Sequence, residues 1–286
     1  MNKSRLMLAA CGVAMSVGVG NAQEYGVLLE FSVGNQKFSN VLNSNDDGVY
    51  QNFSDTVYVG SLSAGLSFGS FGLQLDRVVD SSGDPGDDKG GFSARSTTLH
   101  ANYRTGAYAV GLFYGVGDNS PPVDSDLGDV TFRGVEAAAS FDTYRIAGQI
   151  GSASHTNEHS SLDYSNEMYG IVEAQVYLDN GLTLSGSLGY GTGIIHDDDI
   201  GVTQVAFGVS KALGSSGLVG TAGLRHTMTT DHESGSNEGK GNNTELLIGL
   251  TLPLGGGSVR EVNENSVSMM RTNLPAIVAA MTAVYD

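Results

Sequence analysis

Between Glu24 and Leu254 the chain repeats a segment of about ten residues in which apolar and polar side chains alternate. In the segment GLTLSGSLGYG, Leu182, Leu184 and Leu188 fall on one parity, whereas Ser185 and Ser187 fall on the other. Successive side chains of a β-strand point to opposite faces, so each segment predicts a strand with one apolar and one polar face. A helix would instead place its apolar residues three and four apart. The chain is therefore expected to be all-β.

Tight and long connections alternate along this region, which is expected if short turns face the periplasm and long loops face the outside. A soluble β-sandwich has no reason to keep that order. We therefore expect a closed antiparallel up-and-down transmembrane β-barrel of about 12 strands over residues 23–254. The strands are expected near residues 24–34, 56–68, 71–80, 96–104, 108–117, 130–141, 143–152, 167–178, 181–192, 202–213, 217–228 and 244–254. The long connections are expected near residues 35–55, 81–95, 118–129, 153–166, 193–201 and 229–243.

The two ends of the chain differ from the barrel region. Residues 1–22 carry Lys3 and Arg5, then an apolar run, then small residues, which is typical of a secretory signal peptide. The string LAAC ending at Cys11 resembles a lipoprotein cleavage site, a less favoured alternative because the apolar run continues past it. Residues 255–286 are expected to form a C-terminal tail that is disordered, a short helix or a plug.

Composition excludes several classes of protein. Cys11 is the only cysteine, which argues against a small disulfide-stapled secreted domain. No apolar run after the signal peptide is long enough for a transmembrane helix. The formal net charge is −17 at pH 7, so nucleic acid is not an expected partner. We expect export to the bacterial outer membrane, with lipid and lipopolysaccharide as surroundings.

Aromatic side chains provide an independent check, because amphipathic rings favour the headgroup level of a membrane. Near the tight turns, seven aromatic residues share the expected lipid-facing parity: Tyr25, Phe68, Phe71, Tyr103, Tyr108, Phe141 and Tyr144. At the opposite rim the candidates are Tyr58, Tyr114, Phe132 and Tyr190. Because Phe132 and Val135 fall on opposite parities, a β-bulge near Gly134 is expected to bring both outward.

The polar parity places a set of charged and amide side chains in the lumen. These predicted pore-lining residues are Glu30, Gln74, Asp76, His100, Asn102, Arg104, Arg145, Gln149, Glu173, Gln175, Arg225 and Glu245. Charge inside a barrel requires water or an opposite charge. The other lumen residues are mostly Ser, Thr, Ala and Gly, which cannot fill the interior alone. Water then fills the lumen and makes a pore, or a loop or the tail plugs it.

Acidic residues concentrate in the long connections: Asp46, Asp47, Asp84, Asp87, Asp88, Asp124, Asp126, Asp129, Asp197, Asp198, Asp199 and Glu233. A mouth of one charge sign concentrates counterions and favours cations over anions. The clusters DPGDDKG and HDDDIG could alternatively bind Ca²⁺, but neither has EF-hand spacing. No metal site and no cofactor is predicted.

Catalysis is the weakest of the functional hypotheses. A barrel hydrolase would use His100 or His155 with a nucleophile and an acid in contact. The chain has no G-x-S-x-G, H-E-x-x-H or phosphate-binding loop. We therefore expect a protein that is not an enzyme.

The strings EYGVLLEFSVGNQKF, GSLSAGLSFGSFGLQLD and NTELLIGLTLPL, together with the export signal, resemble those of Gram-negative outer-membrane porins over about residues 24–254. The resemblance implies passive diffusion of small hydrophilic solutes through a barrel constricted by an inward-folded loop, for which residues 35–55 are the candidate. General porins have sixteen strands and form trimers, whereas twelve strands are expected here; the resemblance leaves open whether this chain forms a homo-oligomer. Bacterial barrels also commonly end on an aromatic residue, whereas this chain ends at Asp286.

The sequence thus favours a porin-like channel for ions and small hydrophilic solutes, mildly selective for cations. The alternatives are a closed structural or adhesive barrel and, less favoured, a barrel hydrolase.

Overall fold

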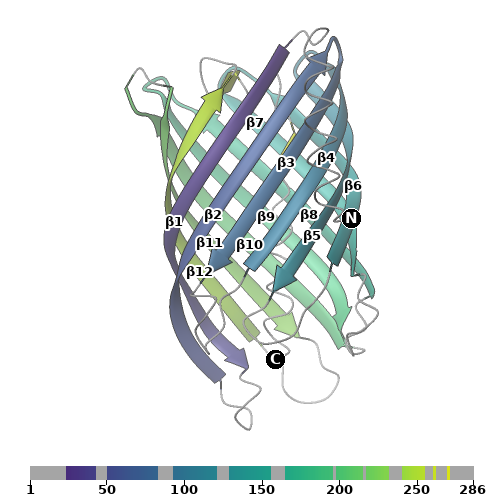
Figure 1. Ribbon diagram of the computed structural model, residues 1–286, viewed down its shortest axis with the longest axis vertical. Coiled ribbons are helices and arrows are strands. Elements are labelled where there is room, and N and C mark those ends of the chain that lie inside the picture. The colour runs from purple at the N-terminus through teal and green to yellow at the C-terminus, as the bar shows by residue number, and fades with distance from the viewer. Residues whose placement is uncertain are drawn as a thin grey trace, which may run out of the picture.

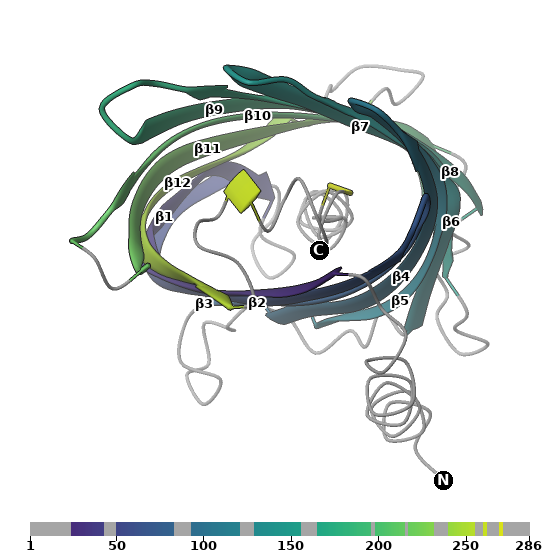
Figure 2. The ribbon, with the colours of Figure 1, turned by 90° about the horizontal axis from the view of Figure 1, so that it is seen from above.

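The computed structural model describes residues 24–42, 50–82, 93–120, 129–155, 165–195, 198–214, 217–231, 240–254, 260–261 and 269–270. Within these ranges each strand pairs antiparallel with its neighbour in sequence, and β12 pairs with β1 to close the barrel (Figures 1 and 2). The strands are β1 Glu24–Leu42, β2 Tyr50–Phe68, β3 Phe71–Ser82, β4 Ser93–Thr105, β5 Tyr108–Ser120, β6 Asp129–Ser140, β7 Tyr144–His155, β8 Ser165–Tyr177, β9 Leu182–Ile195, β10 Asp198–Ala212, β11 Val219–Asp231 and β12 Lys240–Leu254. The predicted all-β, closed, up-and-down barrel is confirmed. The described residues contain no helix that is long and apolar enough to cross a membrane.

Closure depends on a long ladder between the first and last strands. The β1 and β12 pairing runs from Val27 opposite Leu254 to Ser39 opposite Asn242 without a register shift. Because every strand has two neighbours, the barrel has no free edge at which backbone groups would lack partners.

The expected loop at residues 35–55 is mostly strand, so that prediction is wrong. The β1 and β2 hairpin extends to Leu42 opposite Tyr50, with one register shift between Phe38 and Val41. This extension carries polar side chains on both faces, such as buried Gln36 beside exposed Lys37. A strand beyond the hydrocarbon layer needs no apolar face, so its sequence is indistinguishable from that of a loop.

The aromatic girdle at the short turns is confirmed. Phe71 and Tyr108 are 64% and 58% exposed on the outer face. Ring pairs connect neighbouring hairpins, with centroids 5.3 Å apart for Phe71 and Tyr103 and 6.0 Å apart for Tyr108 and Phe141. At the turn between β2 and β3, Gly69 has a φ of 62°, which L side chains rarely adopt.

At the opposite rim, Tyr58, Tyr114 and Tyr190 are exposed as expected, but Phe132 is 1% exposed and faces the lumen. The β6 ladders to β5 and β7 have no register shift, so the predicted bulge near Gly134 is also wrong. Val135 faces outward while Phe132 packs inside. Phe132, which shares the parity of the polar residues of β6, is thus an interior side chain.

Candidate functional site in the barrel lumen

All twelve predicted pore-lining residues lie on the parity opposite the exposed apolar belt. Glu30, Arg104, Glu173 and Gln175 are half-buried, and the remaining eight are buried. Buried members of this set contact side chains on strands that are not their neighbours, such as His100 on β4 with Glu136 on β6, so they lie inside the barrel. Their lining of a conducting path remains a prediction.

A group of five residues from β3, β4, β6 and β7, here named the histidine cluster, lies on one side of the lumen: Gln74, Asp76, His100, Glu136 and Gln149. The Nδ1 atom of His100 is 2.9 Å from Oε1 of Glu136, and its Nε2 atom is 3.1 Å from Oδ2 of Asp76. Gln149 Nε2 donates to Oε2 of Glu136 at 3.0 Å. The His100 side chain is 0% exposed, so protein groups must replace water as its polar partners. The two carboxylates supply those partners.

Contact between His100 on β4 and Glu136 on β6 requires a small residue on β5 between them. That residue is Gly111, where an added Cβ would lie 3.1 Å from Oε1 of Glu136 and 2.8 Å from the carbonyl oxygen of Ala101. A glycine on the intervening strand therefore allows the ion pair to form.

A second group, here named the arginine bridge, joins strands four positions apart in the barrel. Arg225 on β11 donates from Nη2 to Oδ2 of Asp80 on β3 at 2.8 Å. Its Nε donates to Oε2 of Glu245 on β12 at 2.8 Å, and Asn243 Nδ2 donates to the other oxygen of Glu245 at 2.9 Å. All three charged groups are buried, so the guanidinium compensates two carboxylates at once.

An apolar group, here named the aromatic cluster, fills the lumen beside β5 to β8 near the long-loop end. It consists of Phe113, Val130, Phe132, Ala153 and Tyr169, with Ile171 packed against it. Glycines on neighbouring strands seat the rings: an added Cβ at Gly115 would lie 2.2 Å from the Phe132 ring. Close ring-to-glycine packing excludes side chains and water from this part of the lumen.

Two residues of the C-terminal tail, Met269 and Met270, lie inside the barrel. Most of residues 255–286, and with them the predictions of disorder, a short helix or a plug, lie outside the described residues. Met269 and Met270 are 2% and 6% exposed and pack against alanines of β5, β6 and β7. Figure 2 shows the described pieces of the tail, in yellow, inside the ring of strands. Met269 and Met270 thus occupy part of the lumen, whereas the described residues of the 35–55 segment, 35–42 and 50–55, belong to strands of the wall.

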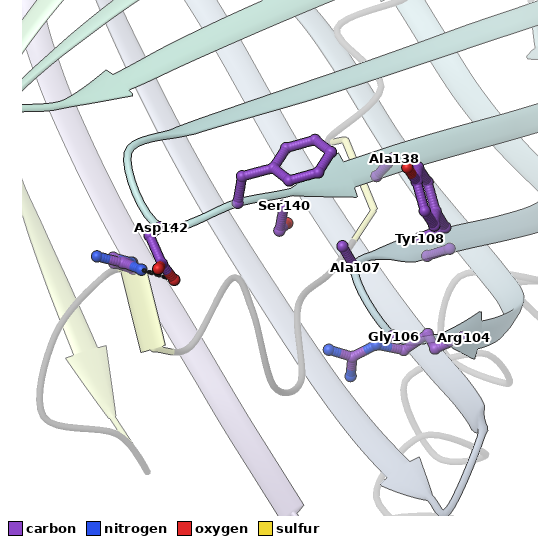
Figure 3. A pocket seen from close by; sticks show the side chains of 10 residues that line it. Arg104, Gly106, Ala107, Tyr108, Ala138, Ser140 and Asp142 are labelled. Atoms are coloured by element: carbon purple, nitrogen blue, oxygen red, sulfur yellow. Dashed lines mark ion pairs between the residues drawn. The ribbon is translucent and has the colours of Figure 1, made fainter.

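Arg260 lies at the short-turn end of the barrel, where it contacts two barrel residues. Its Nη2 lies 3.8 Å from Oδ1 of exposed Asp142, and its guanidinium carbon lies 5.2 Å from the centroid of the Tyr177 ring. Figure 3 shows this ion pair at a cavity of about 290 Å³ beside the turns that follow β4 and β6. The cavity is also lined by Arg104 and Tyr108.

The opposite side of the lumen retains accessible space. A cavity of about 250 Å³ lies against the short-turn half of β8 to β12 and β1. Its polar lining includes Glu30, Glu173, Gln175, Thr183 and Ser185. These side chains are all half-buried rather than buried, because small neighbours leave room for water beside them.

Nearer the long-loop end, the same strands present buried interior side chains. Ile200, Val202 and Thr227 are 1%, 0% and 3% exposed. Among the described residues, those that line the cavity therefore lie mainly in the short-turn half of these strands.

Several interior side chains of the candidate site were not predicted from the sequence. Glu136 sits beside Arg133 in the strand whose parity was misjudged, and Asp80 was the last residue of its expected strand. The alternation of β6 without a bulge would have identified Glu136. The insertion of Met269 has no local signal, because it depends on partners nearly 200 residues away.

The sequence also raised catalytic histidines and a metal site as alternatives and placed acidic residues in the long connections. His100 is fully buried and contacts carboxylates on both sides of its ring, and His155 ends β7. In the described ranges, no group of three or more His, Cys, Asp or Glu is arranged to hold a metal ion. Among the acidic residues of the long connections, Asp129, Asp198 and Asp199 belong to strands, and the others, like the signal peptide, lie outside the described residues.

Comparison with known proteins supports the fold. A scan against protein-family models and a search of curated proteins gave no match. Among solved structures, an outer membrane channel from Pseudomonas putida F1 is similar, with 13% identity, a TM-score of 0.51, and coverage of 82% of this chain and 97% of that one. The translocator domain of the autotransporter NalP from Neisseria meningitidis matches at 12% identity and a TM-score of 0.43, covering 87% of this chain and 95% of that one. The chain thus has the fold of outer-membrane β-barrels of the porin-like kind.

Proposed function

We propose that the protein is an outer-membrane channel for passive diffusion of ions and small hydrophilic solutes, with a mild preference for cations. The observation that carries this proposal is the accessible polar cavity along β8 to β12 and β1. A barrel whose only role was structural would gain stability by filling that volume with apolar side chains. Glu30 and Glu173 line this cavity together with Arg260, and Glu173 pairs with Arg145 at 3.4 Å. The proposed preference for cations therefore depends on the net charge of −17 and on the acidic residues of the long connections.

The barrel is expected to lie among outer-membrane lipid and lipopolysaccharide, in line with its apolar outer belt and aromatic girdle. Ions and small polar solutes are its expected cargo, and no resident cofactor is required. The channel from Pseudomonas putida F1 shares this architecture, which supports a channel role without identifying the solute.

Planar-bilayer recording of purified, refolded protein tests the proposal. Small discrete conductance steps and a reversal potential of cationic sign in a salt gradient are expected. Heat-denatured protein is the control. Absence of steps from both the full chain and a folded chain ending at Glu261 would overturn the channel role, and a reversal potential of anionic sign would overturn the selectivity.

The second candidate is a closed barrel with a structural or adhesive role. The buried histidine cluster and the inserted tail favour it, because they close one side of the lumen. The same recordings separate the two candidates.

A further inference from the structure

Two buried glutamine side chains bind the backbone of the inserted tail. Gln74 on β3 accepts from the Met269 N–H at its Oε1, at 3.0 Å, and donates from Nε2 to the Met269 carbonyl oxygen, at 3.2 Å. Gln149 on β7 donates from Nε2 to the Met270 carbonyl oxygen at 2.8 Å. A carboxamide that bonds both peptide groups of one residue reproduces the exchange made between paired antiparallel strands.

The orientation of both carboxamides is fixed by the histidine cluster. Gln74 Nε2 also donates to the carboxylate of Asp76, at 3.0 and 3.1 Å, and Gln149 Nε2 donates to Glu136 at 3.0 Å. Because carboxylates only accept, they hold each amide nitrogen toward the cluster and fix which atoms face the tail. The lumen wall is therefore preorganised for a peptide backbone.

Small side chains complete the site. Met269 and Met270 pack against Ala109, Ala138 and Ala147, where larger residues would occupy the space that the tail takes. Methionine is flexible and fills irregular apolar gaps. Recognition through the backbone and through alanine surfaces suits an extended peptide with apolar side chains.

The tail is a tethered ligand of this site. Covalent connection of the tail to the end of β12 raises its effective concentration, so that few contacts suffice to keep it docked. No covalent link or ladder with a barrel strand holds Met269 and Met270; the described contacts are the three hydrogen bonds and the alanine packing. Such a segment can leave without breaking the barrel.

We infer that the lumen face between β3 and β7 is a peptide-docking site, that Met269 and Met270 occupy it as an exchangeable plug, and that release of these two residues opens the channel. This inference rests on the proposed channel function. It explains why buried polar groups that could line a pore instead point at two backbone peptide units.

The first test uses the full chain in planar bilayers and compares two substitutions at one position. Met269→Pro removes the N–H that Gln74 accepts, whereas Met269→Ala keeps it. Loss of one hydrogen bond corresponds to about a fivefold change in the docking equilibrium, so the open fraction should rise about fivefold or more in Met269→Pro. Met269→Ala should give a smaller rise than Met269→Pro.

The second test adds the tail back as a separate molecule. A chain ending at Glu261, shown to be folded by heat-modifiable electrophoretic mobility, is recorded with a synthetic peptide of residues 265–273 on the short-turn side. Dose-dependent block is expected, and the same peptide with proline at the Met269 position should block at least about fivefold more weakly.

The outcomes separate the inference from the proposed function. Equal open fractions in wild type, Met269→Pro and Met269→Ala, all conducting, would overturn the plug and leave the channel intact. Block by both peptides with equal potency would also overturn backbone docking at Gln74. Folded variants that never conduct would overturn both proposals. If the shortened chain does not fold, the comparison of Met269→Pro and Met269→Ala in the full chain is sufficient to test the plug.

Discussion

The two sides of the lumen are built from the same alternating strands but are filled differently. Along β3 to β7 the mid-strand interior groups are buried by the histidine cluster, the aromatic cluster and the docked tail. Along the short-turn half of β8 to β12 and β1, small and hydroxyl side chains leave a cavity of about 250 Å³. The difference lies in side-chain volume and pairing rather than in strand geometry. The β3 to β7 side, here named the sealed side, is filled at mid-strand and has its cavity of about 290 Å³ beside the turns after β4 and β6, whereas the β8 to β12 and β1 side, here named the accessible side, has its cavity against the strands themselves.

The largest expected effect tests the sealed side. His100→Leu leaves the carboxylates of Asp76 and Glu136 buried without their shared partner, and should lower the free energy of unfolding by about 3–5 kcal/mol. Guanidinium titration of the refolded barrel in lipid vesicles measures it. The matched control on the accessible side is Ser187→Ala, expected to stay within about 0.5 kcal/mol. Equal effects at the two sites would remove the distinction between the sides.

An intermediate effect on stability is expected from a substitution that tests the packing of the aromatic cluster on the sealed side. Gly115→Ala places a Cβ 2.2 Å from the Phe132 ring, so the ring must move. The free energy of unfolding should fall by about 1–3 kcal/mol in the same titration. Gly60→Ala, with no atom within 4 Å of the added Cβ, is the control and should change it by less than about 1 kcal/mol. An unaffected Gly115→Ala barrel would contradict the inward position of Phe132.

The smallest effect on stability is expected on the accessible side. Glu30→Gln removes one charge beside the cavity, and the free energy of unfolding should change by less than about 1 kcal/mol. The reversal potential should move toward zero, because one fixed negative charge near the water is lost. Asp179→Asn, at an exposed turn, is the control and should leave the reversal potential near the wild-type value. A larger shift for Asp179→Asn than for Glu30→Gln would place the selective region outside the cavity.

The strand pattern was predictable because each face of a strand meets a different environment, lipid outside and the barrel interior inside. Lipid selects apolar side chains at positions such as Leu188 and Ile248, and the headgroup region selects rings such as Tyr103. Both requirements act on single residues, so alternation alone gives strand number, parity and girdle. The same logic failed at Phe132, because an apolar side chain on the inner face packs on a neighbouring glycine and has no lipid contact.

Partners across the lumen were not predictable. Asp80 and Arg225 are separated by 145 positions in the chain, and Gln74 and Met269 by 195. The pattern of residues within one strand does not indicate which distant segment will lie opposite it across the lumen. The predicted inward loop at residues 35–55 failed for a related reason, because backbone pairing to β12 and between β1 and β2 continues where the side chains are polar on both faces.

The sequence by itself determined an even-stranded barrel, its inner and outer faces, and the polar residues turned inward, since each follows from the solvent that meets a strand. Only the tertiary structure decided which inward groups pair, which side of the lumen stays accessible, and that Met269 and Met270 lie inside it. Those outcomes depend on distances between strands and on side-chain volumes across a closed sheet, which exist only once β12 has paired with β1.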